Sequence, residues 1–144
     1  MFARIAVAYD ESPEAARALA TAIRLAKTLG SELRAITIKE DPPVYTSYAS
    51  AVDSCLARTL DEDQQERYEK LHAEAKECAS RDGVGLVTHL LEGAECETIV
   101  QFLYHHRTDL LVIGLHRHTS HISRLWSTVY EVAQDAPCCV LGVH

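Results

Sequence analysis

Basic and hydroxyl side chains are concentrated in one stretch near the end of the chain, LLVIGLHRHTSHISRLWSTVYE, residues 110–131. The stretch runs from an apolar strand, through a loop with three histidines and two arginines, into a helical pattern. Histidine and arginine side chains bind anions, and so do the free N–H groups at the start of a helix. We therefore expect an anion site where this helix begins, at Ser127, Thr128 and Val129.

The histidines of this loop also raise the alternative of a metal site. His116 and His118 form a His-x-His pair with His121 close behind, and such pairs ligate zinc or copper. However, residues 115–126 hold no carboxylate or cysteine, and Arg117 between the two histidines repels a cation. Spacing without a full ligand set is weak support. We therefore assign no metal ligand and favour a solvated basic loop or a dimer contact.

Strand and helix patterns alternate along the chain. We predict strands at residues 4–10, 31–40, 86–93, 109–114 and 138–144, and helices within 11–30, about 51–81, 94–108 and 128–135. Such alternation implies parallel pairing through right-handed crossovers, with helices on both faces of one sheet. Because no repeat, linker or low-complexity segment interrupts the pattern, we expect residues 1–144 to form one domain.

Several residues indicate helix ends and helix faces. Ser12 before Pro13 predicts a helix start, Gly30 its end, and Thr128 with Glu131 a capping box. The predicted inner faces are Ala15, Leu19, Ala22, Ile23 and Ala26 in the first helix, Leu56, Leu60, Tyr68, Leu71 and Ala75 in the second, and Ile99, Phe102 and Leu103 in the third.

The overall charge is acidic, at −7 with histidine neutral. Nucleic acid and anionic membranes both bind positive surface, so we expect neither as a partner. The start MFARIAVAYD enters a strand without the pattern of a secretion signal, and the five cysteines lack a disulfide-rich spacing. We expect a cytoplasmic protein with reduced, mostly buried thiols.

Ligands of open parallel sheets bind beyond the carboxyl ends of the strands. The strand ends that reach this edge are Ala8, Tyr9 and Asp10, then Ile38 and Lys39, then Ile113 and Gly114. Asp10 has two interpretations here, as a general base or ribose ligand, or as a turn residue that bonds the loop N–H groups before Ser12. The sequence leaves both open.

Three stretches resemble motifs of the universal stress protein family. VAYDESPEA (residues 7–15) resembles the opening VAVDGSE, EGAECETIVQFLYHHRTDLLVIG (92–114) resembles GxPxxxIxxxAxxxxxDLIVMG, and STVYEVAQDAPCCVLGVH (127–144) resembles GSVxxxVxxxAPCPVLVV. The resemblance covers almost the whole chain. It implies an α/β fold: a single Rossmann-like three-layer sandwich of the adenine nucleotide alpha hydrolase-like type, with a five-stranded parallel sheet of order 3-2-1-4-5. It also implies a homodimer through the last strand.

Many members of this family bind ATP through glycine-x-x-glycine, nine residues, and then glycine with serine or threonine. On this chain those positions are Gly114, Arg117 and Ser127 followed by Thr128, so two glycines are replaced. The resemblance also matches Asp10 to an aspartate near the nucleoside, and it matches Ile38 and Ile113 to apolar positions beside the base. The candidate nucleotide site is therefore Ala8, Asp10, Ile38, Ile113, Gly114, Arg117, Ser127, Thr128 and Val129.

The lost glycines make the usual backbone cradle for phosphate unexpected, since Arg117 places a side chain where main chain would approach. No nucleophile with an adjacent base and orienting acid is recognisable, so we assign no catalytic residue and no certain cofactor. We favour a regulatory binding dimer with a degenerate nucleotide site. The alternatives are an ATP-binding, weakly hydrolysing protein that holds ATP with Mg²⁺ through Arg117 and Arg124, and a pure interaction protein.

Overall fold

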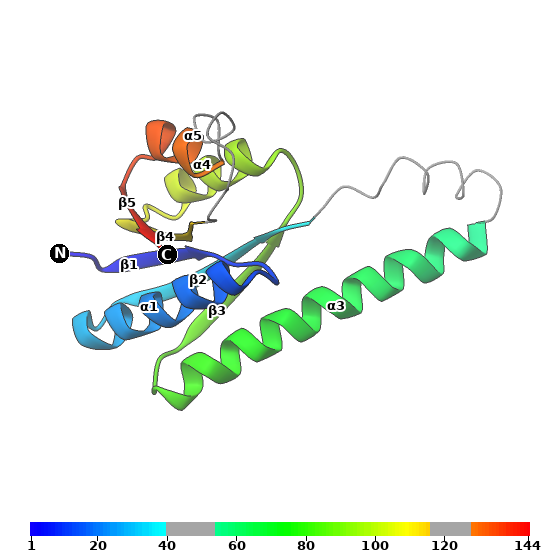
Figure 1. Cartoon of the computed structure of the whole chain (residues 1–144), viewed down its shortest axis with the longest axis horizontal. Coiled ribbons are helices and arrows are strands. Elements are labelled where there is room, and N and C mark those ends of the chain that lie inside the picture. Colours follow the sequence, from blue (N-terminus) through cyan, green and yellow to red (C-terminus); the bar gives the residue numbers. More distant parts are fainter. Residues whose placement is uncertain (40–53, 116–127) are drawn as a thin grey trace.

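The computed structural model describes residues 1–39, 54–115 and 128–144. The elements in chain order are β1 (Arg4–Ala8), α1 (Pro13–Leu29), β2 (Glu32–Ile38), α3 (Ser54–Arg81), β3 (Leu86–Leu91), α4 (Glu95–His105), β4 (Leu110–Gly114), α5 (Thr128–Asp135) and β5 (Cys139–Val143) (Figure 1). Every predicted strand and helix is present, with ends that differ by a few residues. In these ranges no helix combines the length and apolarity needed to cross a membrane.

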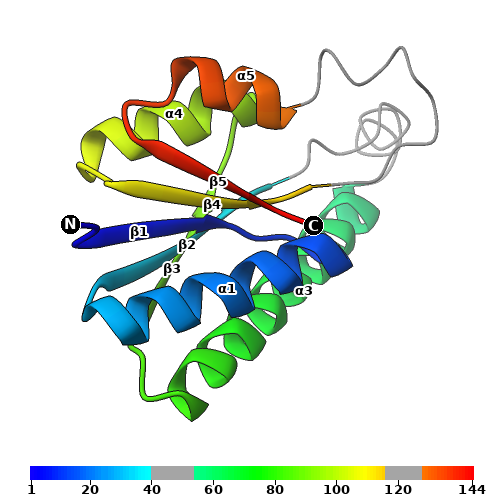
Figure 2. The ribbon, with the colours of Figure 1, turned by 60° about the vertical axis from the view of Figure 1, so that its left-hand side comes forward.

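The five strands form one parallel sheet in the order β3-β2-β1-β4-β5. β1 is central, with Val7 opposite Ala35 of β2 and Val112 of β4. Helices α1 and α3 cover one face of the sheet, and α4 and α5 cover the other (Figure 2). The predicted Rossmann-like three-layer sandwich with strand order 3-2-1-4-5 is therefore confirmed.

Side chains of the central strands divide between two cores, because successive residues of a strand point to opposite faces. Ile5 and Val7 pack with α1 and α3, whereas Ala6 packs with α4 and α5. The predicted inner faces of two helices are buried throughout: Ala15, Leu19, Ala22, Ile23 and Ala26 in α1, and Ile99, Phe102 and Leu103 in α4. Both faces are confirmed.

The ends of α1 follow from local sequence. The Ser12 hydroxyl accepts a hydrogen bond from the Ala15 N–H at 3.1 Å, and Pro13 is the first helical residue. Gly30 at the other end is left-handed, with φ 67°, and its N–H donates to the Ala26 carbonyl. A residue without Cβ adopts this conformation at little cost, so the predicted start and end are both confirmed.

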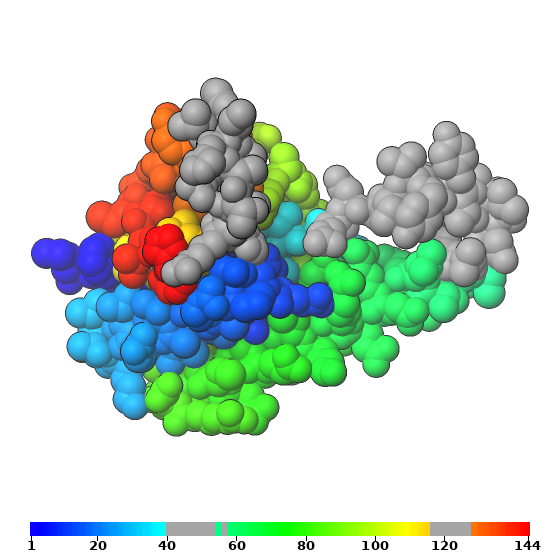
Figure 3. Space-filling model, in the orientation of Figure 1, coloured from blue at the N-terminus to red at the C-terminus, as the bar shows by residue number. Residues whose placement is uncertain are grey.

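Helix α3 was only partly predicted. Tyr68, Leu71 and Ala75 are buried as expected, but Leu60 is 42% exposed. Figure 1 shows the N-terminal half of α3 extending beyond the strands, so this part of the helix has no sheet to cover. In the space-filling view of Figure 3 the same part of the chain projects from the main body of the molecule. The prediction for Leu60 was therefore wrong, while the side chain of Leu56 lies outside the described part of the chain.

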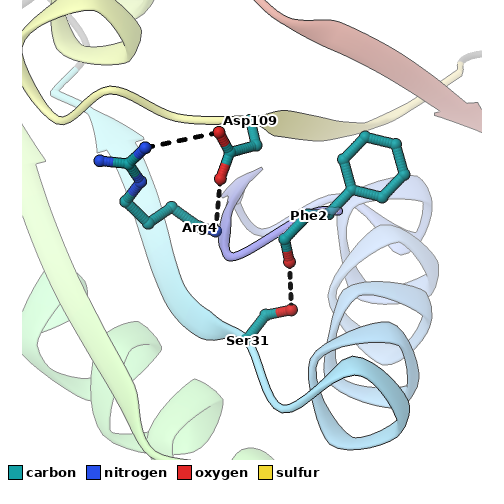
Figure 4. Close-up of polar contacts among 4 residues, drawn as sticks. All are labelled: Phe2, Arg4, Ser31 and Asp109. Carbon is teal, nitrogen blue, oxygen red and sulfur yellow. Dashed lines mark hydrogen bonds and ion pairs between the residues drawn. The ribbon is translucent and has the colours of Figure 1, made fainter.

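Polar contacts join the starts of the central strands (Figure 4). The Arg4 N–H donates to Asp109 Oδ2 at 2.8 Å, and Arg4 Nη2 lies 3.5 Å from Asp109 Oδ1. The Ser31 hydroxyl donates to the Phe2 carbonyl. Chiefly through the hydrogen bond from the Arg4 backbone, the pKa of the Asp109 carboxyl is held below its ordinary value. These contacts tie β1 to β4 and to the start of β2.

The cysteine side chains are more exposed than the sequence suggested. All five are free thiols; Cys55, Cys78 and Cys139 are exposed, and Cys96 and Cys138 are partly buried. The expectation of mostly buried thiols was therefore wrong. Two of the exposed positions follow from their elements, since Cys55 is the second residue of α3, in the part that extends beyond the sheet, and Cys139 begins an edge strand.

Candidate functional site

A cavity of about 510 Å³ lies beyond the carboxyl ends of β1, β2 and β4, beside the starts of α4 and α5. Its described lining is Ala8, Tyr9, Asp10, Ser12, Ala15, Ile36, Ile38, Lys39, Gly93, Glu95, Ile99, Ile113, Gly114, Thr128 and Val129. Crossover connections leave β1 and β4 toward opposite faces of the sheet, and ligands of open α/β sheets bind at such points. The volume is in the range of small-molecule sites.

The structure brings together the predicted site residues that it describes. Ala8, Asp10, Ile38, Ile113, Gly114, Thr128 and Val129 all line the cavity. Arg117 and Ser127 lie outside the described residues, as do Arg124 and the three histidines of the loop. Among the residues the structure does describe, no group of three or more His, Cys, Asp or Glu side chains could hold a metal ion.

Backbone contacts fix the end of β1, which carries Asp10 into the cavity. The Tyr9 N–H donates to the Ile36 carbonyl at 2.9 Å, and the buried Thr37 hydroxyl donates to the Tyr9 carbonyl at 2.8 Å. One residue later, Asp10 Oδ1 accepts a hydrogen bond from the Ser12 N–H at 2.8 Å. The turn role of Asp10 is therefore confirmed, and its carboxylate remains at the cavity wall.

Gly114 lies where the end of β4 meets the first turn of α1. A Cβ at this position would lie 2.6 Å from the Glu14 carbonyl carbon and 2.7 Å from the Glu14 carbonyl oxygen. Both atoms are backbone, so they cannot rotate away. The packing of α1 on the sheet thus requires glycine here, independently of any phosphate.

The start of α5 faces a carboxylate. The Thr128 hydroxyl donates to Glu95 Oε2 at 3.2 Å, and the Cys96 thiol donates to the Thr128 carbonyl at 3.5 Å. Burial, followed by the hydrogen bond to Glu131 and nearby acidic charges, raises the pKa of Cys96 to about 12. The Cys96 thiol therefore stays protonated at neutral pH and serves as a donor.

The described lining of the cavity is acidic on balance. Lys39 is the only cation among the described lining residues, and its Nζ lies 3.3 Å from Asp61 Oδ1 and 3.5 Å from Glu92 Oε1. The hydrogen bond to Asp61 is the main cause of the raised pKa of Lys39. Since Lys39 is already paired, Asp10 and Glu95 leave this part of the wall negative.

Sequence reasoning missed the contribution of the α4 start. Gly93, Glu95 and Ile99 line the cavity although they follow β3, an edge strand. Gly93 has φ 129°, a conformation that requires glycine, and it directs the chain into α4. A signal was present, because Glu95 stands where the GxPxxxI motif has proline, with Gly93 and Ile99 at its fixed positions.

Comparison with known proteins agrees with this architecture. A model of the universal stress protein family matches residues 1–144. The chain is 30% identical to universal stress protein MJ0531 of Methanocaldococcus jannaschii over 144 residues, covering 99% of this chain and 82% of that protein. It is 33% identical over 146 residues to a universal stress protein of Thermus aquaticus, with complete coverage of both chains.

Solved structures show the same fold. UspA from Lactobacillus plantarum superposes with a TM-score of 0.80 at 22% identity, covering 100% of this chain and 99% of that one. A universal stress protein in complex with cAMP gives a TM-score of 0.76 at 22% identity, covering 99% and 97%. A universal stress protein from Archaeoglobus fulgidus in complex with dAMP gives 0.71 at 18% identity, covering 99% and 98%.

Proposed function

The chain belongs to the universal stress protein family, and on that premise we propose that it acts as a cytoplasmic, single-domain stress-response protein that binds an adenine nucleoside or nucleotide. The observation that carries the proposal is the cavity itself, at the strand ends where the family resemblance placed a nucleotide. Fold neighbours in complex with cAMP and dAMP support the same class of ligand.

The cavity walls suit the parts of such a ligand. Ile38 and Ile113 offer apolar surface for a flat heteroaromatic base. The carboxylate of Asp10 has acceptor capacity beyond the single hydrogen bond from Ser12, and ribose hydroxyls are donors. We therefore place the base between the ends of β2 and β4 and the ribose near Asp10. Binding, not fast chemistry, is the activity that these groups support.

Thermal unfolding in the presence of adenosine, AMP, and ATP with Mg²⁺ tests this function. A ligand at a hundred times its dissociation constant adds about 2.7 kcal/mol, which raises the melting temperature by about 5–10 °C. Asp10→Asn keeps an oxygen for the Ser12 turn but removes the charged acceptor for the ribose hydroxyls, so we expect a smaller shift with adenosine. Asp82→Asn, at an exposed position paired with Lys27, is the matched control. No shift with any of the three compounds would refute the proposal.

We also propose a homodimer through β5. In β5 the Cys139 N–H donates inward to the Asp109 carbonyl at 3.3 Å, and the Val143 carbonyl accepts inward from Leu115 at 2.7 Å. Because residues of a strand alternate between its two sides, Val140 and Gly142 direct their N–H and C=O groups to the open edge of the sheet. An apolar edge strand of this kind pairs readily with a second copy.

A further inference from the structure

The described lining of the cavity includes a carboxylate at the start of a helix. Glu95 is the first residue of α4, and its Oε2 accepts the hydrogen bond from the hydroxyl of Thr128, the first residue of α5. Two helix starts therefore meet at one carboxylate. Helix N-termini stabilise negative charge, and Ala94, the N-cap of α4, supplies no side-chain hydrogen bond of its own.

From this contact we infer that Glu95 occupies the position of a ligand phosphate and makes the cavity select uncharged adenine nucleosides over phosphorylated ones. The inference rests on the proposed adenine-binding function and specifies the ligand class of the same site. A phosphate at the start of α5 would compete with Glu95 for the Thr128 hydroxyl and for the helix N-terminus. It would also lie beside a like charge, which is unfavourable.

The other charges of the described cavity wall do not offset this effect. Asp10 adds a second carboxylate, and Lys39 is already paired with Asp61 and Glu92. Ile38 and Ile113 form an apolar part of the wall. Because they carry no charge, their contact with the base is the same whether or not the ligand is phosphorylated. In the described part of the wall, base and ribose therefore meet no like charge, and the repulsion acts on phosphate.

Two substitutions separate the charge of Glu95 from its shape. Glu95→Gln keeps an oxygen that can accept the Thr128 hydrogen bond but removes the negative charge. Glu97→Gln makes the same change of charge in the same turn of α4, at an exposed side chain that does not line the described cavity and accepts a hydrogen bond from Gln101 at 3.2 Å. Both positions are exposed, so we expect both variants to fold, and their unliganded melting curves verify this.

The experiment is isothermal titration calorimetry of the full chain with adenosine, AMP and magnesium-free ATP. We expect the wild type to bind adenosine more tightly than AMP or ATP. In Glu95→Gln the affinity for AMP and ATP should rise by about tenfold or more, since removing one like charge near a phosphate commonly has an effect of that order. The affinity for adenosine should change little, and Glu97→Gln should resemble the wild type.

Each other outcome counts against the inference. If wild type binds AMP or ATP more tightly than adenosine, and Glu95→Gln leaves that preference unchanged, the inference fails while the proposed function stands. An equal gain in Glu97→Gln would mean that overall charge, not the Thr128 contact, controls phosphate binding. A preference for adenosine that survives in Glu95→Gln would assign the selectivity elsewhere. If no adenine compound binds any of the three proteins, both proposals fail.

Discussion

At Gly114 the end of β4 approaches the backbone of Glu14 so closely that no side chain fits between them. The nearest backbone atoms would lie 2.6 and 2.7 Å from an added Cβ, well inside ordinary van der Waals contact. This glycine therefore has a structural reason to be retained even though Arg117 and Ser127 replace the family's other two glycines. The residue alone does not establish phosphate binding, and its substitution has a measurable effect without any ligand.

We expect Gly114→Ala to lower the free energy of unfolding by about 1–3 kcal/mol, because α1 must shift away from the sheet to admit the methyl group. Urea unfolding followed by circular dichroism measures the loss. Gly85→Ala is the matched control, since a Cβ there meets nothing within 4 Å. Equal stability of the two variants would contradict the proposed packing constraint.

At the same scale, the sequence was sufficient for residues whose role depends on a strand end. The carboxyl ends of parallel strands share one edge, so Asp10, Ile38 and Ile113 could be placed together from the strand pattern alone. Glu95 could not, because its place depends on how α4 returns from the edge strand β3 across the sheet toward β4. That path brings the start of α4 beside the start of α5. The family motif marked the position of Glu95, but the strand and helix patterns do not predict its contact with Thr128.

Among the elements, α4 is joined to the β2–β3 edge by an aromatic and basic cluster. The His89 ring lies 4.8 Å from Phe102 and 5.2 Å from His106, and Phe102 lies 4.1 Å from His106, between ring centroids. Arg34 Nη1 lies 3.5 Å from His89 Nε2. Since a guanidinium only donates, His89 Nε2 must accept, so this contact requires the neutral ring.

The surroundings of both rings oppose protonation. Burial, then the charges of His106, Arg34 and His72, lowers the pKa of His89 from its ordinary 6.5. Burial, then Arg34 and His105, lowers the pKa of His106. Glu32, 3.6 Å from Arg34, is the nearby acid. A folded-state pKa below the unfolded value means that the unfolded chain takes up protons first as the pH falls.

We therefore expect the free energy of unfolding to be fully maintained above about pH 6.5 and to decrease as the pH falls from there toward 5. His89→Gln removes one titrating group while keeping an acceptor for Arg34, and it should flatten this decrease. His105→Gln, at an exposed position of the same helix, should leave most of it. Urea unfolding at several pH values measures the slopes, and parallel slopes in wild type and His89→Gln would exclude this role of the cluster.

Helix prediction shows the same division between local and tertiary causes. The cap at Ser12 and the left-handed Gly30 are encoded within a few residues, so both ends of α1 could be read from the sequence. Leu60 lies on the correct helical period, yet it is exposed because α3 continues past the sheet that its inner face would cover. Periodicity predicts which residues share a face, but the extent of the partner surface is a property of the whole fold.

For the whole molecule, the two open edges of the sheet differ in their suitability for pairing. β5 has the sequence CVLGV, without a charged residue, and none of its residues is fully buried. The opposite edge strand, β3, carries His89 beside Arg34, and charge near an edge discourages strand addition. The acidic net charge of −7 adds a general repulsion between copies, so a stable dimer needs a locally apolar contact. β5 is the edge that provides one.

Replacing Leu141 tests this assembly. Leu141 is 37% exposed at the middle of β5, and a lysine there would place a charge in each half of a symmetric interface. Because the symmetry doubles the desolvation penalty, we expect Leu141→Lys to weaken dimerisation by about a hundredfold or more. Leu29→Lys, at a 48% exposed position at the end of α1, is the control and should dimerise as the wild type does.

Sedimentation velocity over a range of concentrations measures the dissociation constants. A wild type that stays monomeric throughout, or a Leu141→Lys variant that dimerises as well as Leu29→Lys, would remove β5 as the interface.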